Sequence, residues 1–296
     1  MSHVPIRDVD LYYQSEGEGV PILFIHGGVA GPEPRFHALH ADGAPRLTTP
    51  EAALAVLARE ARFVSYHRRG HGLSGVSPGA YRIEDLAADA GALLDHLDVQ
   101  QAVVIGHSLG GMVALQLALD APNRVARLCL ASTGAGLLSS EDRFGRGNLA
   151  HFYANVSSDV ALSKTAGLRS AFEARREGLR RTSERAPAGM AEWLASLHDD
   201  ELCAMYGALL RDCEAFLEVD LSARLAELRM PVAVIHGGAD RWVPIAHGRH
   251  LHESIAHATW LELPDAGHAN LLDRADGLLA VARFVRGDGA AGARAA

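Results

Sequence analysis

The chain has 296 residues, 48% of them hydrophobic and 22% charged, and its formal net charge is −8. The acidic balance argues against nucleic acid or an anionic membrane surface as a partner, because both select for clustered positive charge. No leader-like pattern opens the sequence, and no apolar run reaches the roughly 18 residues that a membrane span requires. Three cysteines at irregular spacing do not form a disulfide framework. We therefore expect one large, reduced and cytoplasmic domain, or one domain with an insertion.

The first part of the chain alternates between short apolar runs and helical periodicity. The run from Pro21 to Ile25 is continuously apolar, which is typical of a buried parallel strand, and it ends at His26-Gly27-Gly28. Residues 29–50 are rich in Gly, Pro and His and are expected to form a long loop. Further strands are expected at 9–14, 62–66, 102–105 and 125–131, and helices at 50–61, 83–97 and 110–119.

The character of the sequence changes between residues 134 and 227. Strand-like runs stop there and helical periodicity dominates, whereas strands (232–235, 259–263) and helices (245–251, 270–285) alternate again afterwards. This order predicts an α/β fold with a mostly parallel sheet flanked by helices. The core would comprise residues 1–133 and 228–286, interrupted by a helical cap at 134–227, and the Gly/Ala-rich tail at 287–296 is expected to be disordered.

The segment Gly106-His107-Ser108-Leu109-Gly110 lies where a predicted strand turns into a predicted helix. This is where a nucleophile elbow must lie, since the turn exposes the serine at the carboxyl end of the sheet. The N-terminus of the following helix also favours developing negative charge. The bare pentapeptide can arise by chance, but its position predicts that Ser108 is a catalytic nucleophile.

A serine hydroxyl needs a general base, and the base needs an acid that orients it. His268 follows the predicted strand at 259–263, and Asp240 follows the predicted strand at 232–235. We expect them to be the base and the acid. Asp265 is a rival acid, but it lies in the same loop as His268 and is more typical of a turn residue.

An oxyanion hole needs two backbone N–H donors. Leu109, directly after the nucleophile, should supply one. The loop at His26-Gly27-Gly28 should supply the other, from Gly28 or, as a second choice, from Val29. Val29, Met112 and Trp242 are candidates for contact with substrate, the last two because they closely follow the elbow and the acid.

Five segments together resemble the α/β-hydrolase fold family, over about residues 9–285 except the cap and the 29–50 loop. They are Phe24-Ile25-His26-Gly27-Gly28, Arg69-Gly70-His71-Gly72-Leu73-Ser74, Gly106-His107-Ser108-Leu109-Gly110-Gly111, the segment from Pro231 to Asp240, and Gly267-His268. The resemblance implies an eight-stranded-type sheet and the order nucleophile, acid, base that this chain shows. One position departs from it: His67 stands where relatives usually carry an aspartate, so we expect a changed local hydrogen bond and the same chemistry.

These residues predict a serine hydrolase that cleaves a carboxylic ester or lactone through an acyl-enzyme, without metal or cofactor. Alternatives on the same triad are a carbon–carbon bond hydrolase of aromatic degradation, a biosynthetic acyltransferase and a perhydrolase. A ligand-binding, receptor-like protein on the same fold is the non-enzymatic alternative. The partner is expected to be a small-molecule substrate. The oligomeric state is open, with a homodimer among the possibilities.

Overall fold

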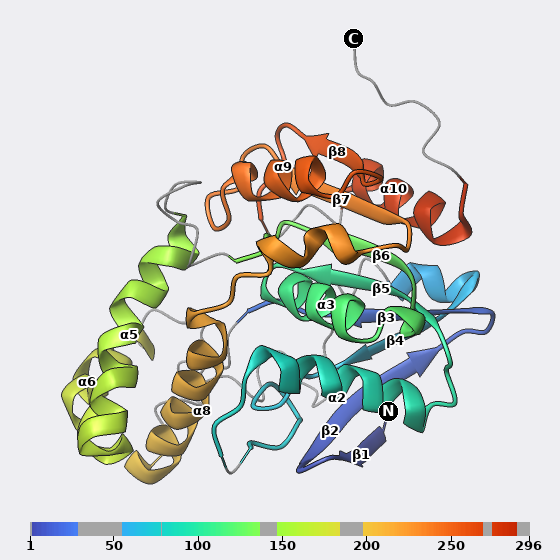
Figure 1. The fold of residues 1–296 in the computed structure, drawn as a ribbon. Helices are drawn as coiled ribbons and strands as arrows, with labels where there is room; N and C mark the ends of the chain where they lie inside the picture. Colours follow the sequence, from blue (N-terminus) through green and yellow to red (C-terminus); the bar gives the residue numbers. More distant parts are fainter. Residues whose placement is uncertain are drawn as a thin grey trace.

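An eight-stranded sheet forms the centre of the computed structural model, which describes residues 2–28, 55–77, 79–136, 147–183, 198–268 and 274–288 (Figure 1). The strand order is β1-β2-β4-β3-β5-β6-β7-β8. Strand β2 pairs antiparallel with β1 and β4, and every other neighbouring pair is parallel. The strands are β1 (Ser2–Ile6), β2 (Val9–Glu16), β3 (Val20–Ile25), β4 (Ala61–Tyr66), β5 (Ala102–His107), β6 (Val125–Ala131), β7 (Val232–Gly237) and β8 (Thr259–Leu263). The predicted α/β class with a mostly parallel sheet is confirmed.

Helices cover both faces of this sheet. Helices α2 (Ile83–His96), α3 (Leu109–Asp120) and α9 (Ile245–Ser254) share the larger apolar cluster with one face. The 3-10 helix η1 (Ala55–Arg59) and helix α10 (Ala275–Arg286) form a second cluster with the other face. Strand β5 is buried along its whole length, as its continuous apolar run predicts. Two further 3-10 helices are η2 (Pro122–Arg124) and η3 (Ser222–Glu227).

Three helices follow β6 and pack against one another beside the sheet (Figure 1): α5 (Asn148–Ala166), α6 (Leu168–Ser183) and α8 (Asp199–Leu217). They lie near the carboxyl ends of the parallel strands, because the amide of Asn148 donates to the carbonyl of Arg241, just after β7, at 2.8 Å. Apolar residues of α8, such as Phe216, belong to the same cluster as the sheet core. These helices fall within the segment at 134–227, which we continue to interpret as a cap.

The predicted elements differ from the structure at both ends of the chain and at residues 50–61. Of that predicted helix, the described part is the short 3-10 helix η1, and Ala61 already belongs to β4. Strand β1 is absent from the predicted elements, because Pro5 removes a backbone donor and only two of the five residues are buried. Pro5 is tolerated because β1 lies at the edge of the sheet. At the other end, α10 begins at Ala275, whereas the predicted helix at 270–285 begins within residues 269–273, which lie outside the described residues. The loop at 29–50 and the tail from 289 also lie outside them.

Candidate active site

Ser108 occupies the turn between β5 and α3 with φ 55° and ψ −126°, a backbone conformation that residues other than glycine rarely adopt. Two contacts to the end of β6 hold this turn: the Ser108 amide donates to the Ala131 carbonyl at 3.0 Å, and the Thr133 hydroxyl donates to the Ser108 carbonyl at 2.6 Å. Gly110 permits the tight packing of α3, because a Cβ there would lie 2.2 Å from the Ile25 carbonyl oxygen. The strain at Ser108 is therefore imposed by surrounding backbone, as at a nucleophile elbow.

One chain of hydrogen bonds joins Ser108, His268 and Asp240. Asp240 Oδ2 lies 2.8 Å from His268 Nδ1, and His268 Nε2 lies 2.9 Å from Ser108 Oγ. Because an ionised carboxylate can only accept, Nδ1 donates to Asp240 and Nε2 is left to accept the serine proton. The structure thus brings together the three residues that the sequence predicts as nucleophile, base and acid.

The Asp240 carboxylate has no exposed side-chain surface and is held on both oxygens. Its Oδ1 accepts the amides of Trp242 at 2.8 Å and Val243 at 2.9 Å, while Oδ2 accepts from His268. Burial raises the pKa of Asp240, but the hydrogen bond and charge of His268 and the Val243 amide outweigh it and hold that pKa below its usual range. Asp265, the rival acid, is exposed. The geometry therefore favours Asp240 as the partner of His268.

Two backbone segments border the Ser108 hydroxyl where the sequence predicts an oxyanion hole. Leu109 is the first residue of α3, so its amide belongs to the helical turn whose N–H groups lack intrahelical acceptors. The loop after β3 passes directly beside the nucleophile, since a Cβ at Gly27 would lie 2.6 Å from Ser108 Cβ. The next residue, Gly28, has φ 79°, and no described residue lies within 4 Å of the position that a Cβ would take there. Val29, the second-choice donor, lies outside the described residues.

Of the three predicted substrate contacts, Val29 lies outside the described residues and the other two are placed differently. The Trp242 ring centroid lies 6.4 Å from that of His268, and the residue is 46% exposed. Met112 has no exposed surface and packs inside the larger apolar cluster. The structure therefore places Trp242, and not Met112, at an exposed position beside the predicted base.

His67, the departure from the family pattern, makes a local contact. Its Nδ1 accepts the amide of Leu73 at 2.9 Å, and its carbonyl accepts the Ser74 hydroxyl at 2.6 Å. The imidazole and the backbone carbonyl of His67 thus each bind the far end of the same turn, and neither bond involves Ser108, His268 or Asp240.

His107 is a further residue of the site for which the sequence analysis assigned no role. Its Nε2 donates to the backbone carbonyl of His268 at 2.9 Å, and the two rings lie 4.9 Å apart. It therefore fixes the main chain that carries the predicted base. Its position immediately before the serine could have indicated this role. The sharp turn places this residue against the loop that brings the base to the serine.

Burial, together with the neighbouring His268, lowers the pKa of His107 from its ordinary 6.5 to about 4. The unfolded chain therefore takes up a proton as the pH falls through 6.5, whereas the folded chain stays neutral here until about 4. The folded state loses stability across that window, by about 2 kcal/mol for such a histidine between roughly pH 7.5 and pH 5. Replacing His107 with glutamine, which keeps an N–H donor, should reduce the difference in unfolding free energy between these two pH values by about that amount.

Urea unfolding of both proteins at the two pH values measures this difference. The exposed His151 on α5 supplies the control variant, His151→Gln, which should behave as the unsubstituted protein does. Equal acid sensitivity of the His107 variant and the unsubstituted protein would contradict a neutral, buried His107.

Comparison with known proteins agrees with this architecture. A family model described as alpha/beta hydrolase fold matches residues 20–275. The 3-oxoadipate enol-lactonase 2 of Acinetobacter baylyi is 31% identical over 215 residues, which cover 71% of this chain and 73% of that protein. A pimeloyl-(acyl-carrier protein) methyl ester esterase of Aromatoleum aromaticum is 33% identical over 193 residues, covering 63% of this chain and 74% of that protein. The crystal structure of an enol-lactonase from Burkholderia xenovorans has 26% identity and a TM-score of 0.64, covering 96% of this chain and 98% of that one.

The chain therefore belongs to the α/β-hydrolase fold family, and it is an enzyme of the hydrolase class. Within the described residues, no helix combines the length and apolar character needed to cross a membrane. The same residues contain no group of three or more His, Cys, Asp or Glu side chains arranged to hold a metal ion.

Proposed function

We propose that this protein is a serine hydrolase that cleaves a carboxylic ester or lactone through an acyl-enzyme on Ser108. The observation that carries the proposal is the uninterrupted chain of hydrogen bonds from Asp240 through His268 to Ser108, at 2.8 Å and 2.9 Å. Because the ionised Asp240 carboxylate can only accept, His268 donates to it through Nδ1, which leaves Nε2 as the acceptor that base-assisted attack requires.

In the first step, the Ser108 proton moves to His268 Nε2 while Oγ attacks the substrate carbonyl. The electron pair of the carbonyl moves onto its oxygen, which the amides of Leu109 and Gly28 stabilise. The carbonyl re-forms as the bond to the leaving oxygen breaks, and His268 returns its proton to that oxygen. Water, activated by the same histidine, then hydrolyses the acyl-enzyme and restores the Ser108 hydroxyl. Asp240 stabilises the imidazolium at each stage, and no step requires a metal or a cofactor.

The named activities of the relatives support an ester or lactone as the substrate class. Two of the proteins described above are enol-lactonases and one is a methyl ester esterase. Both reactions break the bond between an acyl carbon and an oxygen, which is the bond that the proposed mechanism breaks. In a lactone, the leaving hydroxyl stays attached to the acyl group, so the acyl-enzyme carries the whole substrate.

A small substrate panel tests the reaction class. We expect burst release of p-nitrophenol from p-nitrophenyl butanoate, and ring opening of five- or six-membered lactones. A vinylogous diketo acid should be cleaved far more slowly, by about 100-fold or more in kcat/KM. The reverse preference would point to the carbon–carbon bond hydrolase instead. Binding of these ligands without burst or turnover would point to the receptor-like alternative.

Product analysis separates hydrolysis from acyl transfer. With an added alcohol, amine or hydrogen peroxide, a hydrolase should still release mainly the free acid. Release of mainly the ester or amide would favour an acyltransferase, and release of mainly the peracid would favour a perhydrolase.

A further inference from the structure

A buried arginine lies behind the loop that we propose to contribute to the oxyanion hole. Arg68 follows β4, and its side chain has no exposed surface. Its Nη2 donates to the Gly28 carbonyl at 2.5 Å, and its backbone amide donates to His26 Nε2 at 3.1 Å. Arg68 therefore holds the loop at His26 and at Gly28, and Gly28 is the residue proposed as an oxyanion donor.

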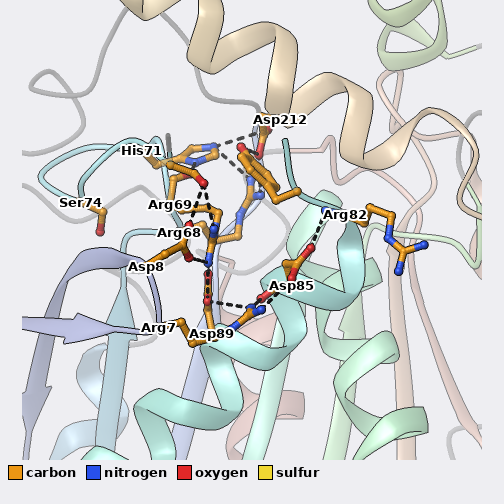
Figure 2. Close-up of polar contacts among 12 residues, drawn as sticks. Arg7, Asp8, Arg68, Arg69, His71, Ser74, Arg82, Asp85, Asp89 and Asp212 are labelled. Atoms are coloured by element: carbon orange, nitrogen blue, oxygen red, sulfur yellow. Dashed lines mark hydrogen bonds and ion pairs between the residues drawn. The ribbon is translucent and has the colours of Figure 1, made fainter. Parts of the chain in front are cut away.

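The other side of the same guanidinium contacts helix α8 (Figure 2). Nη1 donates to Asp212 Oδ1 at 3.1 Å, and Asp212 also has no exposed side-chain surface. The guanidinium carbon lies 5.5 Å from the ring centroid of Phe216, one helical turn further along α8. Nη2 also donates to His71 Nε2 at 3.1 Å. A single side chain thus joins the loop after β3 to the proposed cap.

Gly28 is a residue whose conformation needs such a restraint. Glycine has more backbone freedom than any other residue, and Gly28 adopts φ 79° with no atom of the described residues within 4 Å of where a Cβ would lie. The Gly28 N–H lies in the same peptide plane as the Gly27 carbonyl, which accepts from His26 Nδ1 at 2.7 Å. The Gly28 carbonyl lies in the following plane, which Arg68 Nη2 holds. Restraint of both planes limits the rotation about φ and ψ of Gly28 that would turn its N–H away. An oxyanion donor stabilises the transition state only if it already points at the developing charge.

Neighbouring Arg69 shows that burial alone does not give an arginine this role. It is also buried, but its partners are Asp89 on α2, at 2.7 Å through both Nε and Nη2, and Ser77 and Asp8 (Figure 2). These contacts join the turn between β1 and β2, helix α2 and the segment after β4, and none involves the loop at 26–28. Arg69 therefore serves as a matched control for the loss of a buried arginine.

We propose that Arg68 is a positioning residue that couples the seating of α8 to the geometry of the oxyanion hole, through Asp212 on one side and Gly28 on the other. The proposal rests on the proposed function, since it assigns Arg68 to the serine hydrolase mechanism. Arg68 does not serve as a binding site for a negatively charged substrate group, because the carboxylate of Asp212 already neutralises its guanidinium charge. Its effect should therefore appear in the transition state rather than in substrate binding.

The experiment compares Arg68→Gln, Asp212→Asn and Arg69→Gln with the unsubstituted enzyme, each assayed below its Tm. Arg68→Gln should lower kcat for a neutral ester by roughly 10- to 100-fold while KM changes by less than about 3-fold. Affinity for a trifluoromethyl ketone, which forms an alkoxide with Ser108, should fall by the same factor, and affinity for the matching methyl ketone should not. Asp212→Asn should show the same pattern at about 5-fold, whereas Arg69→Gln should lower Tm and keep kcat within about 3-fold.

Unchanged kcat and ketone affinity in folded Arg68→Gln would overturn the proposal, as would a raised KM confined to anionic substrates. If Arg68→Gln does not fold, Asp212→Asn is judged by the same criteria. That variant should fold, because the amide oxygen of asparagine can still accept the hydrogen bond from Arg68. Labelling of the unsubstituted enzyme by a fluorophosphonate probe keeps the two claims apart. Absence of that label contradicts the proposed function, whereas normal labelling with an unaffected Arg68 variant contradicts only this inference.

Discussion

Replacing Ser108 with alanine should lower kcat/KM for an activated ester by on the order of 10⁶-fold, because nucleophile, base and acid act as a unit. The reason lies in the geometry: among the described residues, the hydroxyl that His268 Nε2 is placed to deprotonate, 2.9 Å away, is the Oγ that the substitution removes. The fold should survive, since alanine takes the same backbone position and the three hydrogen bonds to the Ser108 backbone, from its amide and to its carbonyl, remain. Steady-state kinetics with circular dichroism as a folding check measures the effect.

Ser132 supplies the matched control for this substitution. It is also buried with a positive φ of 47°, and its hydroxyl has no hydrogen-bond partner among the described residues. Ser132→Ala should retain activity within about 3-fold. Comparable loss in both variants would show that the Ser108 effect is structural, and retained activity in Ser108→Ala would remove the residue from the mechanism.

Replacing Asp240 with asparagine should lower kcat by on the order of 10⁴-fold. An asparagine that keeps the amides of Trp242 and Val243 on its oxygen turns its NH₂ toward His268, which then accepts at Nδ1 and carries its proton at Nε2. Nε2 can no longer accept from Ser108. In the unsubstituted enzyme, the lowered pKa of Asp240 keeps its carboxylate ionised at neutral pH. The asparagine amide stays uncharged at any pH, so raising the pH should not restore the variant.

Asp265→Asn is the control, because this exposed carboxylate lies in the same loop as His268. It should leave kcat within about 2-fold. A large loss in Asp265→Asn together with an active Asp240→Asn would exchange the roles of the two acids. Pre-steady-state measurement of acylation distinguishes this from a change in product release.

The positions of the proposed triad could be predicted from the sequence because its chemistry restricts where such residues stand. Parallel strands end at one edge of the sheet, so residues directly after β5, β7 and β8 meet there regardless of their separation along the chain. Continuous apolar runs mark these strands clearly. Ser108, Asp240 and His268 could therefore be found from strand order alone.

Contacts that depend on packing could not be predicted in this way. Arg68 follows a strand of the sheet, whereas Asp212 lies 144 positions later on helix α8. Charged residues are ordinarily solvent-exposed, so the sequence does not indicate that these two are buried and paired. His247 shows the same limit: helical spacing suggests a surface position on α9, whereas the structure buries it to 2% exposure. Burial of a polar residue depends on what covers it, and local periodicity carries no information about that.

The most direct test of the central claim is trapping of the acyl-enzyme, followed by peptide mapping. The protein is quenched in acid during the burst with p-nitrophenyl butanoate and, in parallel, is reacted with a fluorophosphonate. Both reagents should add one group to the peptide that contains Ser108, with no adduct in Ser108→Ala and much slower labelling in His268→Ala. Turnover without any adduct on Ser108, or an adduct on another residue that accounts for the activity, would contradict the assignment of Ser108 as the nucleophile.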